Sequence, residues 1–160
     1  MATAVPPSLD ASPELMTARN AHINVLIASA QINDELDRLC RVEDLTHAQY
    51  MTLFVLCLSE GADRGVATGV IADGLLNRAA DTTRLVDRLV KAGLAERAQD
   101  PSDRRLVLVK VTSEGRRRFE HLTELIHDYH LRQWANLSTD EVEQLDALLK
   151  KAIWGDELAT

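Results

Sequence analysis

Basic side chains recur at helical spacing near the middle of the sequence. Residues 77–92 carry the 3.6-residue periodicity of an amphipathic helix, and Arg84, Arg88 and Lys91 fall on its polar side. Three cations on one exposed face can bind the phosphates and base edges of a nucleic acid. An ordinary solvated face with an Asp87–Lys91 ion pair is the alternative. The apolar side comprises Ala79, Thr82, Leu85, Val86, Leu89 and Val90.

A second basic group lies in the polar segment 99–105, which has the composition of a tight turn. Asp100 and Asp103 can hold one following arginine by charge-assisted hydrogen bonds. A narrow tip that presents Arg104 or Arg105 fits a minor groove, where negative potential is concentrated. Arginines that only close local ion pairs are the alternative, and such exposed pairs contribute little stability. The helix and the tip together favour nucleic acid.

The order of elements around these cations is that of a winged helix-turn-helix. The helix of 77–92 ends at Gly93, and two short strands are expected at 94–98 and 106–111. Another helix is expected to begin near Thr112. The predicted fold is therefore mainly α, with a small β-wing of two or three strands.

The segments before this helix complete the predicted DNA-binding unit. A capping box at residues 46–49 opens a helix to about residue 60, and its near-continuous apolar run predicts burial in the middle of the domain. Val66 is expected in a short strand beside the wing. Thr68 is expected as the N-cap of a short helix over 69–76.

Longer helices are expected on both sides of this unit, and a second capping box at residues 138–141 opens the last of them. The first, capped by Ser12, should run to about Arg41 and is apolar on several flanks, so it needs more partners than a small winged domain supplies. Homodimerisation would supply them. The predicted division is a mobile tail (1–12), a dimerisation helix (13–44), the winged helix-turn-helix (45–112) and C-terminal dimerisation helices (113–160), all within one domain.

Four motifs in this order resemble the MarR family of bacterial transcription regulators. They are TRLVDRL (83–89), KAGL (91–94), DPSDRR (100–105) and VTSEG (111–115). The resemblance implies a DNA-binding regulator, a repressor, that binds a palindromic operator as a homodimer. Two recognition helices would then lie on one face of the DNA, about 34 Å apart.

Roles on DNA follow for the basic residues. Arg84 and Arg88 are predicted to meet the major groove, with Arg78 and Lys91 on phosphate. Arg105, held by Asp103, is predicted in the minor groove and Arg104 on phosphate.

The helix-turn-helix departs from the family pattern in two places. The turn reads Leu76–Asn77 instead of a small residue, and the next turn, 78–81, lacks the usual Ser or Thr. Asp81 there can stabilise the helix N-terminus through the dipole or accept a hydrogen bond from a cytosine amino group. The family's base specificity therefore does not carry over.

Charge is unevenly distributed along the 160 residues, whose net charge is −7. Residues 78–118 hold 11 Lys/Arg against 6 Asp/Glu, which leaves 7 Lys/Arg and 19 Asp/Glu for the rest of the chain. A basic patch on an acidic body can still bind DNA because phosphate contacts are local, but with weaker, more salt-sensitive association.

Other kinds of chemistry find little support. The sequence shows no phosphate loop, nucleophile elbow or HExxH motif, so an enzyme is not expected, nor a cofactor. His127 and His130 give two metal ligands where zinc needs three or four. Cys40 is the better of two cysteines for a redox sensor, since Cys57 lies in the most apolar helix. No membrane span or signal peptide is recognisable, so a cytoplasmic protein is predicted.

The resemblance also implies a small effector, often aromatic or phenolic, that releases the protein from DNA. Arg19, His22, His47 and Tyr50 are the candidate residues for its site. The alternative functions are a winged-helix protein–protein module without sequence-specific DNA binding, which a net charge of −7 would suit, and a cysteine- or metal-responsive regulator.

Overall fold

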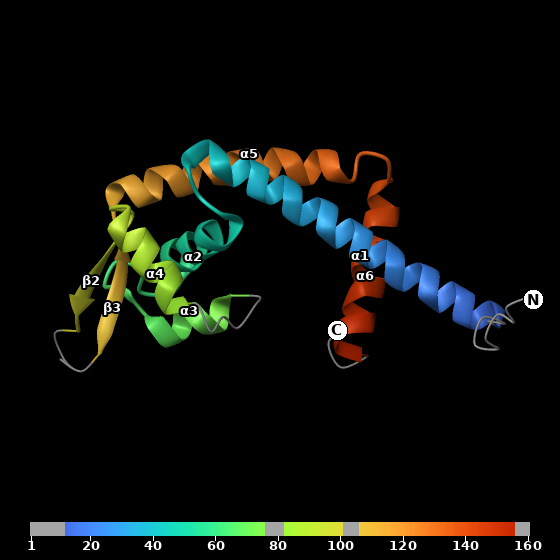
Figure 1. The fold of residues 1–160 in the computed structure, drawn as a ribbon, viewed down its shortest axis with the longest axis horizontal. Helices are drawn as coiled ribbons and strands as arrows, with labels where there is room; N and C mark the ends of the chain where they lie inside the picture. Colours follow the sequence, from blue (N-terminus) through green and yellow to red (C-terminus); the bar gives the residue numbers. More distant parts are fainter. Residues whose placement is uncertain (1–11, 76–81, 101–105, 156–160) are drawn as a thin grey trace, which may run out of the picture.

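The structure is a computed structural model, and it describes residues 12–75, 82–100 and 106–155. Two helical arms extend from a compact body that carries a small sheet (Figure 1). The helices are α1 (Pro13–Cys40), the 3-10 helix η2 (Arg41–Glu43), α2 (His47–Leu58), α3 (Thr68–Gly74), α4 (Thr82–Lys91), α5 (Ser113–Gln133) and α6 (Thr139–Trp154). The strands are β1 (Val66–Ala67), β2 (Ala95–Gln99) and β3 (Val107–Val111). A mainly α fold with a small β-wing is confirmed.

The wing is an antiparallel sheet in the order β1-β3-β2. Ala98 pairs with Leu108, and on the other side of β3 Val66 pairs with Val109. All three strands were predicted, including the two-residue strand at Val66. Because β3 leads directly into α5, the wing is joined to an arm without a linker.

Most helix ends follow the predicted caps. Ser12 caps α1, and both capping boxes form, at Thr46 and at Ser138. Thr68 was assigned wrongly: it lies inside α3, and the N-cap position is Ala67, which has no side chain to accept a hydrogen bond. β1 runs straight into α3, so extended backbone takes the place of the capping turn. Leu76 and residues 77–81 lie outside the described residues.

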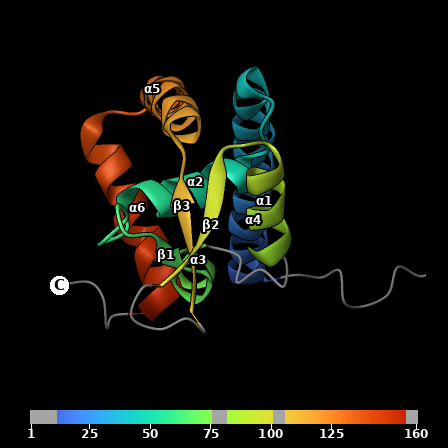
Figure 2. The ribbon, with the colours of Figure 1, turned by 90° about the vertical axis from the view of Figure 1, so that its left-hand side faces the viewer.

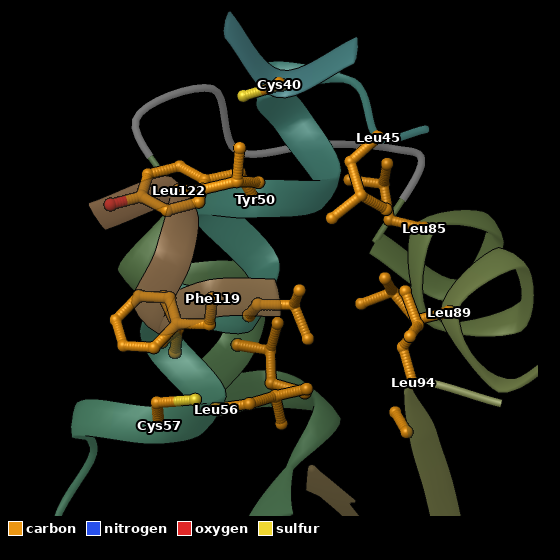
Figure 3. Close-up of a cluster of buried hydrophobic side chains, with 14 of the residues drawn as sticks. Cys40, Leu45, Tyr50, Leu56, Cys57, Leu85, Leu89, Leu94, Phe119 and Leu122 are labelled. Atoms are coloured by element: carbon orange, nitrogen blue, oxygen red, sulfur yellow. The ribbon is translucent and has the colours of Figure 1, made fainter. Parts of the chain in front are cut away.

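α2 lies in the middle of the core, as its apolar run predicts. It contacts α1, α3, α4, α5 and β3. Its buried side chains meet those of α4, α5 and the start of β2 (Figure 3). Not every apolar residue of α2 is covered, however: Phe54 and Leu58 are 38% and 61% exposed, on the side facing α3. The fully buried members include Leu53, Leu56, Leu89, Leu94 and Leu122.

The arms differ from this body. α1 and α5 contact each other where both join the core. The N-terminal half of α1 and the whole of α6 contain no buried residue. Although α1 and α6 cross in Figure 1, Figure 2 shows them on opposite sides of α2. No helix in the described parts of the chain is long and apolar enough to cross a membrane.

Candidate nucleic-acid interface

α4 presents its cations as the sequence predicts. Thr82, Leu85, Val86 and Leu89 are buried, and Val90 packs against the core. Arg84, Arg88 and Lys91 point outward and are exposed. Within the described residues, neither Arg88 nor Lys91 has a carboxylate partner. The Arg88 and Lys91 side chains are therefore open to an anionic ligand.

Asp87 binds a different partner from the one in the solvated-face alternative. Its carboxylate accepts a hydrogen bond from Arg97 Nη2 at 2.6 Å, and the i,i+4 pair with Lys91 does not form. Arg97 projects from β2, so the cation that pairs with Asp87 comes from the wing and not from α4 itself. The bond ties α4 to the wing and leaves Lys91 exposed.

The base of the wing tip is closed by a backbone hydrogen bond. The Asp100 N–H donates to the carbonyl of Leu106 at 3.0 Å. The tip itself, with Asp103, Arg104 and Arg105, lies outside the described residues, as do Arg78 and Asp81. The minor-groove role of Arg105 and the two roles considered for Asp81 therefore remain predictions.

Thr112 joins the wing, α4 and α5. Its hydroxyl donates to the carbonyl of Gly93 at 2.8 Å and accepts from the Gly115 N–H at 3.1 Å. The Thr112 N–H in turn donates to the carbonyl of Leu94 at 3.0 Å. The end of α4 and the start of α5 are thus anchored at one residue.

The four residues proposed for an effector do not come together in one chain. Arg19 and His22 are exposed on the free half of α1, whereas Tyr50 is buried and His47 half-buried in the body. Eighteen residues of helix separate His22 from the end of α1 at Cys40, a distance of roughly 27 Å at the rise of an α-helix.

His47 and Tyr50 do stay together, in a small aromatic group. Their rings stack with centroids 6.4 Å apart, and Tyr50 stacks on Phe119 at 5.8 Å. The Tyr50 hydroxyl lies 3.2 Å from Thr123 Oγ1, and burial raises the pKa of the phenol. Burial likewise lowers the pKa of His47, so the neutral imidazole is favoured.

Two grooves lie elsewhere on the molecule. The larger, about 580 Å³, runs between the loop 60–65 and the outer face of the wing, and its lining is mixed in polarity. The smaller, about 450 Å³, is mainly apolar and includes Phe54, Leu58 and Val70 between α2 and α3. Neither groove is lined by any of the four proposed effector residues.

The two thiols are buried in the core. Cys40 is fully covered and Cys57 is 8% exposed, so the expectation that Cys40 is the more accessible cysteine was wrong. The last turn of α1 is where that helix enters the core, which covers Cys40 on all sides. Burial raises the pKa of the Cys40 thiol to about 12 and that of Cys57 in the same direction.

The histidines of α5 do not gather a metal site. His127 and His130 are exposed, and no group of three or more His, Cys, Asp and Glu side chains converges within the described residues. His121 instead faces Glu43, with Nδ1 2.6 Å from Oε1.

Sequence reasoning missed the charged cluster around Glu43. Arg117, Arg118 and His121 reach that carboxylate from α5, and Glu114 bonds both arginines. A signal was present, since these α5 residues recur at i, i+3, i+4 and i+7 on one face of a predicted helix. Glu43 lies 74 or more residues before the three residues that bind it, and only the fold shows which carboxylate they reach.

Comparison with known proteins assigns the chain to a protein family. A model of the MarR family matches residues 43–106. The chain is 31% identical over 109 residues to the HTH-type transcriptional regulator PapX of Escherichia coli, covering 68% of this chain and 65% of PapX. It is 44% identical over 72 residues to the multiple antibiotic resistance protein MarR of E. coli K12, covering 44% of this chain and 50% of that protein. The chain belongs to the MarR family.

Solved structures of MarR and of CouR share the fold. A mutant MarR from E. coli complexed with operator DNA superposes with a TM-score of 0.71 at 29% identity, covering 82% of this chain and 92% of that one. CouR from Rhodococcus jostii RHA1, bound to p-coumaroyl-CoA, superposes with a TM-score of 0.69 at 25% identity, covering 86% and 94%.

The matched residues show which part of the chain is shared with the family. The region matched by the family model begins in η2 and ends just before β3, so it contains the helix-turn-helix and much of the wing. The chain spans half to two thirds of the length of the two curated relatives. PapX is a transcriptional regulator by name, in agreement with the prediction that the chain is not an enzyme.

Proposed function

We propose that this chain is a transcription regulator, a repressor, that binds a palindromic operator as a homodimer and is released by a small-molecule effector. The observation that carries the proposal is the face of α4, where Arg84, Arg88 and Lys91 are exposed beside the wing while the opposite side of the helix is buried. The complex of MarR with operator DNA supports it.

In this proposal α4 enters the major groove and the wing approaches the adjacent minor groove. Arg84 and Arg88 read base edges, and Lys91 binds phosphate. Arg78, Asp81 and Arg104 extend the contact surface, and Arg105 enters the minor groove with Asp100 and Asp103 supporting it. The Asp87–Arg97 bond holds α4 and the wing in one orientation, so both can engage the same half-site.

In this proposal the arms form the dimer interface. Leu148, Ile153 and Trp154 on α6 are 58%, 64% and 53% exposed, and the free half of α1 exposes Leu26 and Ile27 to a similar degree. Apolar surface of this extent is rarely left in water. A second copy of the chain, related by a two-fold axis, would cover it and set two α4 helices about 34 Å apart on DNA.

The effector part of the proposal rests on CouR, which binds an aromatic acyl-CoA, and on the aromatic group at His47 and Tyr50. Arg19 and His22 would join that group only from a partner subunit, because they lie far from it in their own chain. A regulator that acts on genomic DNA in a bacterium is expected in the cytoplasm.

Fluorescence anisotropy tests the core of the proposal. Purified protein is titrated onto a duplex selected from a random library by the protein itself, and onto a scrambled duplex of equal length, over a salt series. We expect selective binding by a dimer, with log Kd linear in log salt and a slope of about 0.9 per neutralised phosphate. Release of the duplex by members of a panel of phenolic acids and their CoA thioesters would identify the effector class.

The other reading is a winged-helix module that binds proteins. Failure to enrich any sequence, together with absence of binding to both duplexes at low salt, would contradict the regulator and favour that module. The net charge of −7 would suit a surface that binds a protein partner.

A further inference from the structure

Two connections join the winged body to the arms. On one side α1 passes through η2 and Asp44, whose φ of 55° is left-handed, into α2. On the other side β3 passes through Thr112 into α5. A change in the angle between body and arms must alter both connections, and the second is already held by two hydrogen bonds from Thr112 to the carbonyls of Gly93 and Leu94.

Glu43 stands at the first connection and is bound across it by α5. Arg117 Nη2 donates to Oε2 at 3.1 Å, and His121 Nδ1 donates to Oε1 at 2.6 Å, since a carboxylate can only accept. Arg118 Nη1 donates to the backbone carbonyl of Glu43 at 2.8 Å. Side chain and backbone of one residue are thereby both fixed to α5.

Several features distinguish this cluster from a surface ion pair. The Glu43 side chain is only 11% exposed, and the Arg118 side chain 26%. Hydrogen bonds from His121 and Arg117 lower the pKa of the Glu43 carboxyl. Glu114 binds the same two arginines from within α5, which orients them before they reach Glu43. Several charge-assisted bonds with partly buried partners hold geometry better than one exposed pair.

We propose that Glu43 is a positioning residue that locks the corner between α1 and α2 onto α5 and so fixes the angle at which the winged body is held on the dimer arms. The proposal rests on the function proposed above. In a dimer that angle sets the separation of the two α4 helices. Loss of the lock lowers the fraction of dimers with the spacing that an operator requires, and affinity falls by that fraction.

The test variant is Glu43→Gln, which keeps the shape of the side chain and removes its charge. The matched control is Glu35→Gln, which removes a carboxylate hydrogen-bonded to Arg38 inside α1; Arg132 of α5 acts on this carboxylate only through its charge. Each protein is titrated onto the selected duplex and onto versions with one or two base pairs added or removed between half-sites. Unfolding midpoints and sedimentation check fold and assembly.

For Glu43→Gln we expect about 5- to 10-fold weaker binding to the selected duplex and a smaller penalty for altered spacing, with the scrambled duplex unaffected. Glu35→Gln should behave as wild type. Equal weakening on every duplex, or an unchanged spacing preference in a folded dimer, would overturn the proposal, because a merely structural role does not change spacing preference. If Glu43→Gln does not fold, Arg117→Gln takes its place, since that side chain is 55% exposed.

A second readout is independent of DNA and of dimerisation. Spin labels at Thr83→Cys on α4 and Asp128→Cys on α5 report the distance from body to arm within one protomer, with labelled chains diluted into unlabelled ones. Both sites are exposed, and Cys40 and Cys57 are buried. Glu43→Gln should broaden the distance distribution and Glu35→Gln should not. If the distance distribution of Glu43→Gln is as narrow as that of wild type, the lock is refuted. If the distribution of Glu43→Gln broadens but the wild-type protein does not bind DNA, only the proposed regulator function is refuted.

Discussion

Leu122 on α5 and Leu148 on α6 occupy the apolar stripes of two helices from the same chain, yet the first is fully buried and the second 58% exposed. α5 packs on α1 and α2, whereas α6 extends from the body and has no buried residue. An apolar stripe indicates only that a helix packs against some partner, and it does not identify that partner. The stripe of α5 finds its partners within the chain, whereas a partner for the stripe of α6 is expected in a second copy of the chain under the function proposed above.

The largest effect is expected where body and arm are joined. A Cβ added at Gly115 would lie 2.0 Å from the carbonyl oxygen of Leu94, so Gly115→Ala must push the start of α5 away from the wing. We expect a loss of about 2–3 kcal/mol or more of unfolding free energy, measured by urea denaturation. Gly69→Ala in α3 is the matched control: nothing lies within 4 Å of its Cβ, and stability should rise by about 0.5–1 kcal/mol.

The next prediction separates the two kinds of stripe. Leu148→Asp should dissociate the dimer at least about 100-fold while the body stays folded, because an unpaired charge in an interface costs several kcal/mol. Sedimentation velocity measures dissociation of the dimer, and circular dichroism checks that the body stays folded. Glu143→Gln, at an exposed position of the same helix, should leave the dimer intact. A Leu148→Asp protein that stays dimeric would exclude α6 from the interface.

On the outer face of α4, single cations should matter in DNA binding and hardly at all in folding. Arg88→Ala is expected to cost about 1–3 kcal/mol on the selected duplex, and Lys91→Ala to reduce the salt slope by about 0.9. Arg132→Ala, on an exposed part of α5, is the control and should change neither. Binding unaltered by both α4 variants would exclude α4 as the recognition helix.

Buried thiols allow a kinetic check of how tightly the body is closed. With a pKa of about 12, the Cys40 thiol is ionised to roughly one part in ten thousand at pH 8. The reactive thiolate is therefore scarce as well as covered, and labelling by iodoacetamide should be slow in the native protein. Because the folded pKa is raised, a higher pH should speed the reaction, and urea should speed it far more. Rapid native labelling of Cys40 would contradict the packing at the end of α1.

The smallest effect belongs to the bond between α4 and the wing. Arg97 and Asp87 are both largely exposed, so Arg97→Ala should cost less than about 1 kcal/mol of stability. DNA affinity should fall more than stability, since the bond orients two DNA-facing elements. A stability loss above that range would show that the pair is coupled to the core.

Much of this fold could be predicted because local patterns decide it. The two capping boxes, the strand at Val66 and the amphipathic helix ending at Lys91 each follow from residues within one or two turns of one another. The exceptions arose where a neighbour in space intervened. Thr68 does not cap because β1 leads straight into α3, and Asp87 pairs with Arg97 because the wing folds back onto α4.

The candidate interface divides in the same way. The sequence by itself determined which cations share a face of α4, since helical periodicity requires only neighbouring residues. It could not assign Glu43 to Arg117, Arg118 and His121, because pairing across more than 70 residues depends on how α5 lies over η2. Nor could it show that Cys40 is the more deeply buried thiol, which depends on where α1 enters the core. Elements and their polarity are encoded locally; partners are chosen by packing.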